Sequence, residues 1–381
     1  MQSTDHVINN SAPEHVDVLV IGGGQAGLAL GWHLRQSTRS FLLVDAGPEV
    51  GHVWRSRWDS LRLFTPAEYD ALPGMAFPAP TGTYPTKDQV ADYLRDYTAS
   101  YGLPVRVNTR VTRLSKDGHV FIAETTTGWI SAGQVVVATG PFQTPIIPAA
   151  AAGLDRDVIQ LHSAAYRNAQ QLPDGPVVVV GAGNSGLQIA AELAATRDVI
   201  VAIGTRPPGL PQRFLGRDLF WWMTKLGLMD KTAESRLAQR VRAKGDLVIG
   251  TRWRDLADLG VETRPRVVRA SGRTVTFDDG SSTEVAGVIW ATGFRPDYSW
   301  LQVPGVLVDG QIAHRRGITN VPGLSFLGLP WQHTRGSALL GFVRHDAEWL
   351  AGQLLALEHD DERLSVSLDR SAAYGLTRPS R

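Results

Sequence analysis

A G-x-G-x-x-G motif begins at Gly22, and an acidic residue, Asp45, follows eighteen positions after its last glycine. In such a motif the glycines form a tight turn, let a diphosphate approach the backbone, and let a helix pack closely on a strand. The carboxylate of Asp45 can accept hydrogen bonds from a ribose. We therefore expect a dinucleotide site here rather than an ordinary glycine-rich turn. The residues assigned to it are Gly22, Gly24, Gln25, Ala26, Gly27 and Asp45.

The same motif occurs a second time, beginning at Gly181, but the strand that follows it has a different end. That strand ends in Gly204-Thr205-Arg206, without a carboxylate. A carboxylate there would repel a 2′-phosphate, whereas Thr and Arg can bind one, so this second site favours NADPH over NADH. The residues assigned to it are Gly181, Gly183, Asn184, Ser185, Gly186 and Arg206.

Each motif lies between two apolar runs that are long enough for buried parallel strands. Val16–Ile21 and Phe41–Val44 flank the first motif, and Pro176–Val180 and Val199–Ile203 flank the second. Good helix formers follow the last glycine in both cases. The expected fold class is therefore α/β, with two Rossmann-like dinucleotide-binding domains.

The order of these segments predicts that the first domain is split in sequence and that the second is inserted into it. Two Ala-Thr-Gly turns, at 138–140 and 291–293, close the two strand systems. We expect residues 1–145 and 291–358 to form the first domain and residues 156–290 the second. Residues 359–381 are expected to be a polar, weakly ordered tail.

Local patterns predict several further elements. Thr86 and Gln89 form a capping-box pair at the start of a predicted helix, Thr86–Tyr101. The segment from Trp331 to Ser337 is expected to open a last helix, Ala338–Leu355, whose dipole could act on an electron-rich ring. Short apolar runs predict strands at Val105–Val107, Val120–Ala123, Trp129–Ile130, Val135–Val137, Val267–Arg269, Thr274–Phe277, Val285–Trp290 and Leu324–Pro330.

Residues 207–253 do not fit a plain Rossmann domain. This stretch contains an unusually apolar segment, from Phe214 to Met229, which predicts a helical insert. A large apolar surface usually marks a contact. Three interpretations stay open: a lid or wall for an apolar substrate, a dimer contact that would make the chain a homodimer, or a membrane-facing patch.

The composition excludes several classes of protein. The chain has 381 residues, 38 basic and 37 acidic side chains, and no cysteine. The balanced charge argues against nucleic acid as a partner, and the missing cysteines remove disulfides, thiolate metal sites and cysteine nucleophiles. No metal site is expected. The N-terminus lacks the pattern of a secretory signal, and no apolar stretch reaches the roughly 18 residues of a transmembrane segment, so we expect a cytoplasmic protein.

Two dinucleotide motifs, each domain closing on Ala-Thr-Gly, resemble the two-domain flavoproteins. Thiol–disulfide reductases share that plan, but their chemistry needs cysteine. The finer resemblance is to the class B flavin-dependent monooxygenases, the flavin-containing monooxygenase group, over most of residues 16–355. It rests on the segments Gly51–Arg55, Tyr84–Lys87, Leu161–Asn168 and Ala291–Asp297.

The resemblance implies FAD in the first site and NADPH in the second. In this family NADPH reduces the flavin, and the reduced flavin reacts with O2 to a C4a-(hydro)peroxyflavin. One oxygen atom then passes to a small N-, S- or carbonyl-containing substrate, which the apolar insert suggests is hydrophobic. A flavin reductase or oxidase that releases hydrogen peroxide or passes electrons to a partner is the alternative, and a non-enzymatic flavoprotein scaffold is a third.

Further site residues are assigned on the resemblance. Phe64 stands where many members place an Asn near the flavin, and Gln332 and His333 are placed near the flavin or the substrate. These three are candidates for a catalytic role. The lone His162 is interpreted as linker structure rather than a catalyst. Additional cofactor contacts are assigned to Trp54, Arg55, Thr139, Thr292, Gly293 and Ser337.

Overall fold

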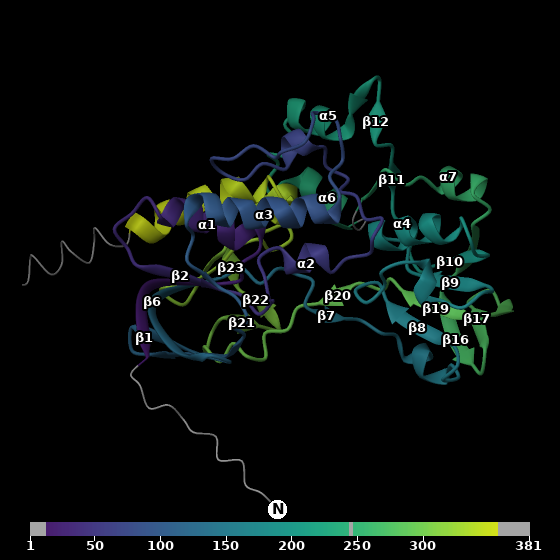
Figure 1. The fold of residues 1–381 in the computed structure, drawn as a ribbon, viewed down its shortest axis with the longest axis horizontal. Helices are drawn as coiled ribbons and strands as arrows, with labels where there is room; N and C mark the ends of the chain where they lie inside the picture. Colours follow the sequence, from purple (N-terminus) through teal and green to yellow (C-terminus); the bar gives the residue numbers. More distant parts are fainter. Residues whose placement is uncertain (1–12, 244–246, 357–381) are drawn as a thin grey trace, which may run out of the picture.

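The computed structural model describes residues 13–243 and 247–356, and these form two sheets with helices packed on them (Figure 1). The larger sheet has nine strands in the order β23-β24-β25-β6-β1-β2-β3, and β4 and β5 extend it from β6. Its strands are β1 (Glu14–Ile21), β2 (Phe41–Val44), β3 (Val105–Arg106), β4 (Val111–Asp117), β5 (Val120–Thr125), β6 (Gly128–Val137), β23 (His314–Arg315), β24 (Ile318–Thr319) and β25 (Leu324–Phe326).

The second sheet has five parallel strands in the order β15-β10-β9-β19-β8. They are β8 (Ile159–His162), β9 (Val177–Val180), β10 (Val199–Ile203), β15 (Glu262–Pro265) and β19 (Gly287–Trp290). The expected α/β architecture is confirmed. In the larger sheet the strands β25-β6-β1-β2-β3 are parallel, whereas β4, β5, β23 and β24 pair antiparallel. The chain between β6 and β25, which are paired with each other, contains the whole second sheet.

The first apolar run is buried on both faces because the sheet has a core on each side. Val18 and Val20 of β1 point into one core, and Leu19 and Ile21 point into the other. Alternate side chains of a strand point to opposite faces, so a strand covered on both sides needs a continuous apolar run. This explains why the segment lacks the polar alternation of a surface strand.

The capping box predicted for the longest helix is present. In α3 (Lys87–Tyr101) the Thr86 side chain accepts a hydrogen bond from the Gln89 backbone N–H, and the Gln89 side chain accepts one from the Thr86 N–H. Val90, Leu94 and Tyr97 of this helix are buried. Four further helices are α1 (Gln25–Leu34), α2 (His52–Arg55), α4 (Asn184–Leu193) and α7 (Trp253–Asp258). Short stretches of 3₁₀ helix lie at Ala67–Tyr69, Ala149–Gly153, Ala169–Gln171 and Arg335–Ala338.

Some predicted elements differ in the structure. The runs Trp129–Ile130 and Val135–Val137 belong to one strand, β6, since Ser131, Ala132 and Gln134 between them are also buried. Strand β4 was not predicted, because most of its side chains are polar and only Val111 and Leu114 are buried.

The last helix begins later than the predicted Ala338. A 3₁₀ turn, Arg335–Ala338, comes first, and the α-helix covers 343–356. Gly341 lies between the two, where a Cβ would collide with the Tyr69 carbonyl, so this close approach requires glycine. The predicted tail, 359–381, lies outside the described residues.

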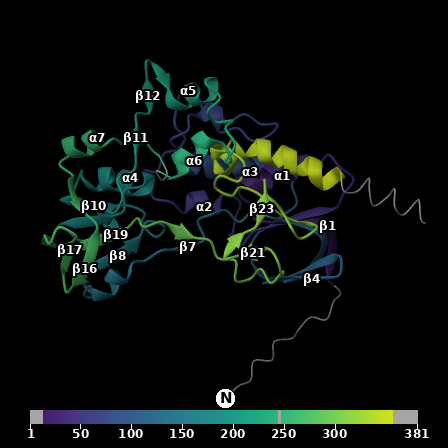
Figure 2. The same cartoon turned by 180° about the vertical axis from the view of Figure 1, so that it is seen from behind.

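The insert is only partly helical. It contains a hairpin of β12 (Arg213–Phe214) and β13 (Arg217–Asp218), followed by α5 (Leu219–Lys225) and α6 (Arg236–Ala243). Figures 1 and 2 show β12 and α5 at the outer edge of the molecule. Small ladders complete the fold: β11 (Gly209–Leu210) with β14 (Val248–Ile249), β16 (Val267–Ser271) with β17 (Thr274–Phe277) and β18 (Ser282–Glu284), and β21 (Leu307–Val308) with β22 (Gln311–Ile312).

Two short strands link the sheets. β7 (Thr144–Pro145) leads from the first sheet to the second, β20 (Phe294–Arg295) leads back, and the two pair antiparallel. In Figure 1 they lie between the two halves of the molecule. The predicted domain boundaries, between 145 and 156 and between 290 and 291, lie near this ladder. They stay a prediction. Within the described ranges no helix is long and apolar enough to cross a membrane.

Candidate functional site

The first glycine motif forms the tight turn between β1 and α1. Gly22 has a φ of +120°, and a Cβ there would lie 2.7 Å from the carbonyl carbon of Ala138. A Cβ on Gly27 would collide with the Gly22 carbonyl oxygen. These two glycines are therefore required by the packing of the protein itself.

Gly24 differs from its two neighbours because nothing in the protein requires it to be glycine. It has an extended conformation, and a Cβ at Gly24 would meet no atom within 4 Å. Gly24 is also the N-cap of α1, and no side chain caps this helix. The first N–H groups of α1 thus face open space at the positive end of the helix dipole, as a diphosphate requires.

Asp45 is fixed beside this turn. Its carboxylate accepts hydrogen bonds from the backbone N–H groups of Gly23 and Gly47, both at 2.7 Å. A carboxylate can accept about four hydrogen bonds, so acceptor sites remain for ribose hydroxyls. The residues present fit the diphosphate and ribose of a dinucleotide.

The second motif repeats this geometry in the other sheet. Gly181 has a φ of +112° and lies against the Ala291 carbonyl, and a Cβ on Gly186 would collide with the Gly181 carbonyl oxygen. Gly183 has open space in front of it and is the N-cap of α4, again without a capping side chain. Asn184, by contrast, uses its side chain within the protein, donating to the Leu247 carbonyl and accepting from the Ile249 N–H.

Two arginines lie at the end of strand β10, although the sequence predicted only one. The guanidinium of Arg206 lies 4.8 Å from the ring centroid of Trp253, and the Arg266 guanidinium is next to Gly204. Arg266 directly follows β15, which pairs in parallel with β10 and ends opposite Ile203. Recognising Glu262–Pro265 as a strand would have indicated the position of Arg266, but this strand was not predicted. Neither guanidinium has a carboxylate partner in the part of the chain that the structure describes.

The two Ala-Thr-Gly turns close over the first glycine of each motif, since Gly22 packs on Ala138 and Gly181 on Ala291. The Thr139 hydroxyl accepts a hydrogen bond from the Gln143 side chain, and the Thr292 hydroxyl donates to the Ile146 carbonyl. Both threonines therefore hold the linker strands in place. Their cofactor contacts stay predictions.

His162 joins the end of β8 to the returning linker. Its Nε2 donates to the Gly293 carbonyl at 3.0 Å, and its Nδ1 accepts from the Ala164 N–H at 3.1 Å. Both nitrogens are thus satisfied by backbone in the neutral ring. Burial lowers the pKa of His162, and the Gly293 carbonyl opposes this in part. The position supports the linker interpretation of this residue.

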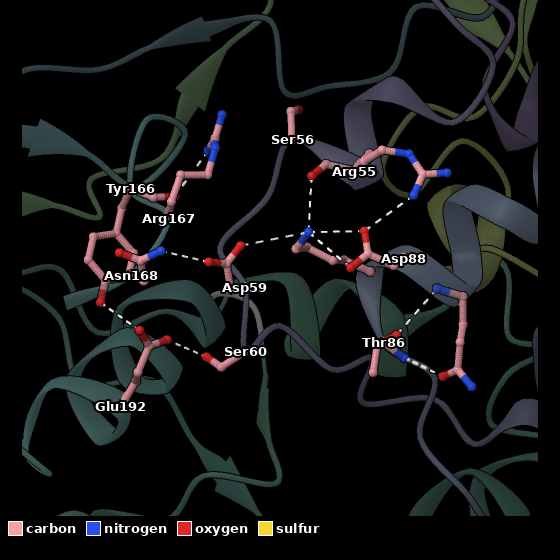
Figure 3. A network of polar contacts seen from close by, with 12 residues as sticks. Arg55, Ser56, Asp59, Ser60, Thr86, Asp88, Tyr166, Arg167, Asn168 and Glu192 are labelled. Carbon is pink, nitrogen blue, oxygen red and sulfur yellow. Dashed lines mark hydrogen bonds and ion pairs between the residues drawn. The ribbon is translucent and has the colours of Figure 1, made fainter. Parts of the chain in front are cut away.

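A polar network joins the first sheet's helices to the second sheet (Figure 3). Lys87 is buried at the start of α3, where its ammonium donates to Asp88 at 3.0 Å and to the Arg55 carbonyl at 3.2 Å, and it lies 3.8 Å from Asp59. Asp59 in turn accepts a 2.7 Å hydrogen bond from Asn168.

The network continues into α4, where buried Tyr166 donates to Glu192 at 2.8 Å and Ser60 donates to the same carboxylate. The loop 55–60 therefore contacts both halves of the molecule. The loop directly follows α2, and α2 is linked to the first glycine motif by Trp54. The indole N–H of Trp54 donates to the Gln25 side chain at 3.3 Å.

Arg55 is placed differently from the assigned cofactor contact. Its guanidinium pairs with Glu49 at 3.2 Å, Asp88 at 3.5 Å and Asp92 at 2.8 Å. The hydrogen bond to Asp92 raises the pKa of Arg55 above its ordinary value. These partners occupy the guanidinium, so a contact between Arg55 and the cofactor would have to come from its backbone in α2. The assigned contact stays a prediction.

An aromatic cluster covers the region between the insert and the first domain. Phe64 stacks on Phe220 of α5, with centroids 6.0 Å apart, and Tyr69 stacks on Phe342 at 6.1 Å. Phe220 and Met223 are buried in this cluster. The inner face of the insert is thus a wall against the first domain, as the lid interpretation expects.

Buried Asp70 follows Tyr69 of this cluster in the chain. Within the described residues the only hydrogen bond of its carboxyl comes from the Thr65 hydroxyl, at 2.6 Å, and its Oδ2 has no partner there. Burial raises the pKa of Asp70 to about 8. The carboxyl is therefore neutral at pH 7, a state that no sequence pattern indicated.

The last three assigned residues lie on the loop before the final helix. Gln332 is buried, accepting from the Leu329 N–H and donating to the Arg316 carbonyl. The Ser337 hydroxyl accepts from the N–H groups of His333 and Thr334. His333 is half-buried, and its carbonyl accepts a 2.7 Å hydrogen bond from Ala233 of the insert. The structure thus gives Gln332 and Ser337 local structural partners, and all three roles stay predictions.

The loop also connects the glycine motif to the insert. The Gln25 side chain donates to the Ala338 carbonyl at 3.5 Å, and Gly336 packs on Phe342 and Met229. A dinucleotide on the first motif would therefore have the aromatic cluster as a neighbour.

Comparison with known proteins agrees with this architecture. A family model described as pyridine nucleotide-disulphide oxidoreductase matches residues 19–210. The chain is 47% identical to "Uncharacterized oxidoreductase CzcO-like" of Geobacillus kaustophilus, over 89% of this chain and 98% of that protein. It is 28% identical to "Indole-3-pyruvate monooxygenase YUCCA8" of Oryza sativa, over 76% and 78% of the two chains. The structure of a flavin-containing monooxygenase from Stenotrophomonas maltophilia is similar at 31% identity, with a TM-score of 0.74 over 90% and 99% of the chains.

The two sheets and the two open glycine turns define the class: a flavoprotein oxidoreductase with two dinucleotide-binding folds. The chain belongs to the pyridine nucleotide-disulphide oxidoreductase family and, within it, to the flavin-containing monooxygenase-like flavoproteins. It is a flavin-dependent oxidoreductase, and its cofactors are FAD and NADPH. The absence of cysteine separates it from the members of the class that reduce disulfides with their own thiols.

Proposed function

We propose that the protein is an NADPH-dependent monooxygenase that transfers one oxygen atom from O2 to a small hydrophobic substrate with a nucleophilic nitrogen or sulfur, or a carbonyl group. The observation that supports this most is the apolar, aromatic wall of Phe64, Phe220 and Phe342 next to the first glycine motif. Oxygen transfer from a flavin needs such a water-poor environment, whereas a simple reductase does not.

The two sites are assigned by the residues at their strand ends. Asp45 at the first site suits the ribose of FAD, and it would repel the 2′-phosphate of NADPH. Arg206 and Arg266 at the second site supply two cations that have no carboxylate partners within residues 13–243 and 247–356, which suits that phosphate. The Arg206 guanidinium lies 4.8 Å from the ring centroid of Trp253, a cation–π contact that uses none of its N–H groups as hydrogen-bond donors.

When bound, FAD would be held by the first glycine turn and Asp45 and would supply the oxygen chemistry. The protein's own residues then have three tasks. The glycine turns hold the two diphosphates, the network around Lys87 and Asp59 fixes the two halves, and the insert excludes water. No acid–base pair is needed for transfer to a soft nucleophile, so the proposal does not assign one.

The substrate proposed is planar and apolar. The rings of Phe64, Tyr69 and Phe342 offer stacking surfaces, and the relative from Oryza sativa is named for an indole substrate. Buried Asp70 is neutral, so it adds no charge behind this wall at neutral pH.

A coupled screen tests the proposal. The purified holoenzyme is supplied with NADPH, ¹⁸O₂ and aromatic amines, thioethers and ketones, and the products are analysed by mass spectrometry. The proposal expects at least one class to gain a single labelled oxygen atom in step with NADPH consumption. NADPH oxidation that yields only hydrogen peroxide with every class would indicate an oxidase instead.

A further inference from the structure

The hairpin of the insert presents two large apolar side chains to solvent, although the Phe214 ring also makes an edge contact with Trp222. It consists of Arg213, Phe214, Leu215, Gly216 and Arg217, which we call the hairpin tip. Phe214 is 56% exposed and Leu215 is 75% exposed. In Figures 1 and 2 the hairpin stands at the outer edge of the molecule, beyond the helices of the first domain.

The base of the hairpin is fixed firmly, so this exposure does not come from a loose loop. The Asp218 carboxylate accepts hydrogen bonds from the Tyr84 hydroxyl at 2.8 Å and the Gln212 side chain at 3.0 Å, and it caps α5 at the Phe220 N–H. The Gln212 side chain also donates to the Phe64 carbonyl at 2.8 Å. Residues 212 and 218 thus anchor the tip to the first domain.

The backbone of the hairpin tip is strained in the folded protein. Leu215 has a φ of +48°, in the left-handed region that a branched apolar residue rarely adopts. Asn, Asp or Gly would fit this turn with less strain and would be better solvated. Leu215 combines this strain with an exposed fraction of 75%, so its side chain gains little from burial in the isolated chain. Strain and an exposed apolar pair at one site point to an external contact.

Positive charge surrounds the apolar tip. Arg213, Arg217 and Lys225 are exposed, and the Arg217 guanidinium lies 5.3 Å from the ring centroid of Trp221. The Trp222 indole N–H donates to the Phe214 carbonyl at 2.8 Å, which places a second half-buried indole at the base of the tip. Two carboxylates, Asp218 and Glu68, act on the charge of Arg213, whose guanidinium donates to the Gly82 carbonyl at 3.2 Å. Asp218 is engaged by its own partners, and Glu68 accepts from the Gly82 N–H at 2.8 Å.

We propose that the hairpin tip inserts into the surface of an anionic lipid bilayer. Phe214 and Leu215 would enter the boundary between headgroups and acyl chains, with Trp221 and Trp222 at headgroup level and the three cations against lipid phosphates. A second copy of the chain fits less well, because a symmetric contact would bring two rings of cations together. The contact goes beyond the oxidoreductase activity and leaves the inner face of the insert on the first domain.

Vesicle sedimentation of the FAD-loaded protein tests this proposal. The probes are vesicles of phosphatidylcholine alone and of phosphatidylcholine with an equal amount of phosphatidylglycerol. We expect binding to the anionic vesicles only, and weaker binding at high salt because the charges are screened. The double variant Phe214→Ser/Leu215→Ser should lower the partition coefficient by roughly tenfold or more, and Arg217→Gln by about fivefold.

Matched controls lie on β16, at the other end of the molecule. Val268 and Arg269 are exposed there, and Val268→Ser and Arg269→Gln should bind vesicles like the wild type. NADPH oxidation by the double variant should equal that of the wild type, which shows that it is folded. Equal vesicle binding by wild type and double variant would overturn the proposal. So would a wild-type dimer in light scattering that the double variant converts to monomer, since a second copy would then cover the tip.

Discussion

Individual glycines have two different functions in this protein, and substitution separates them. Gly27 is required by packing on the Gly22 carbonyl, whereas Gly24 has open space where a diphosphate would lie. We expect Gly24→Ala to fold with a melting temperature within about 2 °C of the wild-type apoprotein but to lose FAD during purification. Gly27→Ala should destabilise the protein by about 3 kcal/mol, because backbone must shift.

Flavin absorbance per protein and thermal unfolding measure the two effects. Gly183→Ala provides the matched control, since Gly183 is the equivalent open position at the second site. It should keep FAD and raise the KM for NADPH. A yellow Gly24→Ala protein with full FAD content would contradict the assignment of the first site.

The preference for NADPH is also decided by single residues. Removing the Arg206 guanidinium takes away a charge-assisted hydrogen bond, so Arg206→Ala should lower kcat/KM with NADPH by roughly 10- to 100-fold. With NADH, which has no 2′-phosphate, the change should stay within about twofold. Arg269→Ala is the exposed control and should change neither value. Equal losses with both nucleotides would contradict the role of Arg206.

At the scale of elements, the paired linker strands depend on a neutral histidine. Burial lowers the pKa of His162 below that of the unfolded chain, so the unfolded state binds the proton more readily. The contribution of His162 is therefore complete above the unfolded pKa of about 6.5 and is lost as the pH falls through the folded pKa.

We expect the free energy of unfolding of the wild type to exceed that of His162→Ala by about 1–2 kcal/mol at pH 8, because the variant loses two hydrogen bonds to backbone. The difference should shrink as the pH falls below about 6.5. Denaturant unfolding of both proteins across this range measures it, and His162→Gln, which can still donate to Gly293, should recover part of the loss. A difference that grows toward acid pH would contradict this account of the linker.

Elements with local signals could be predicted from the sequence, and those fixed by distant contacts could not. The strands Phe41–Val44, Val199–Ile203 and Thr274–Phe277 have the predicted bounds, because short apolar runs between turns define them. The turn before the final helix contains Gly341, whose close approach to Tyr69 joins residues that are far apart in the chain. The hairpin in the insert was missed because Leu215 is not a residue typical of a left-handed turn.

The same division holds for the site. Both glycine motifs and Asp45 could be recognised because their spacing along the chain reflects one strand–turn–helix unit. Arg266 could not, since it reaches Gly204 only through the pairing of β15 with β10. The partners of Arg55 and the buried neutral Asp70 likewise depend on tertiary contacts.

At the scale of the whole molecule, the two halves have to hold FAD and NADPH in a fixed relation. The linker ladder, His162 and the network from Lys87 to Glu192 all cross between the sheets. The insert adds a wall that belongs to the second half in sequence but packs on the first. Exclusion of water by this arrangement is what would separate oxygen transfer from simple release of peroxide.

Rapid mixing of the NADPH-reduced holoenzyme with O2, followed by absorbance, tests oxygen transfer most directly because it requires no substrate. A monooxygenase should show the C4a-hydroperoxyflavin spectrum for seconds or longer before oxidised flavin returns. Phe220→Ser, which opens the aromatic wall, should shorten that lifetime by roughly tenfold or more, while Val268→Ser should leave it unchanged. Immediate return of oxidised flavin with a full equivalent of hydrogen peroxide in the wild type would contradict the proposed function.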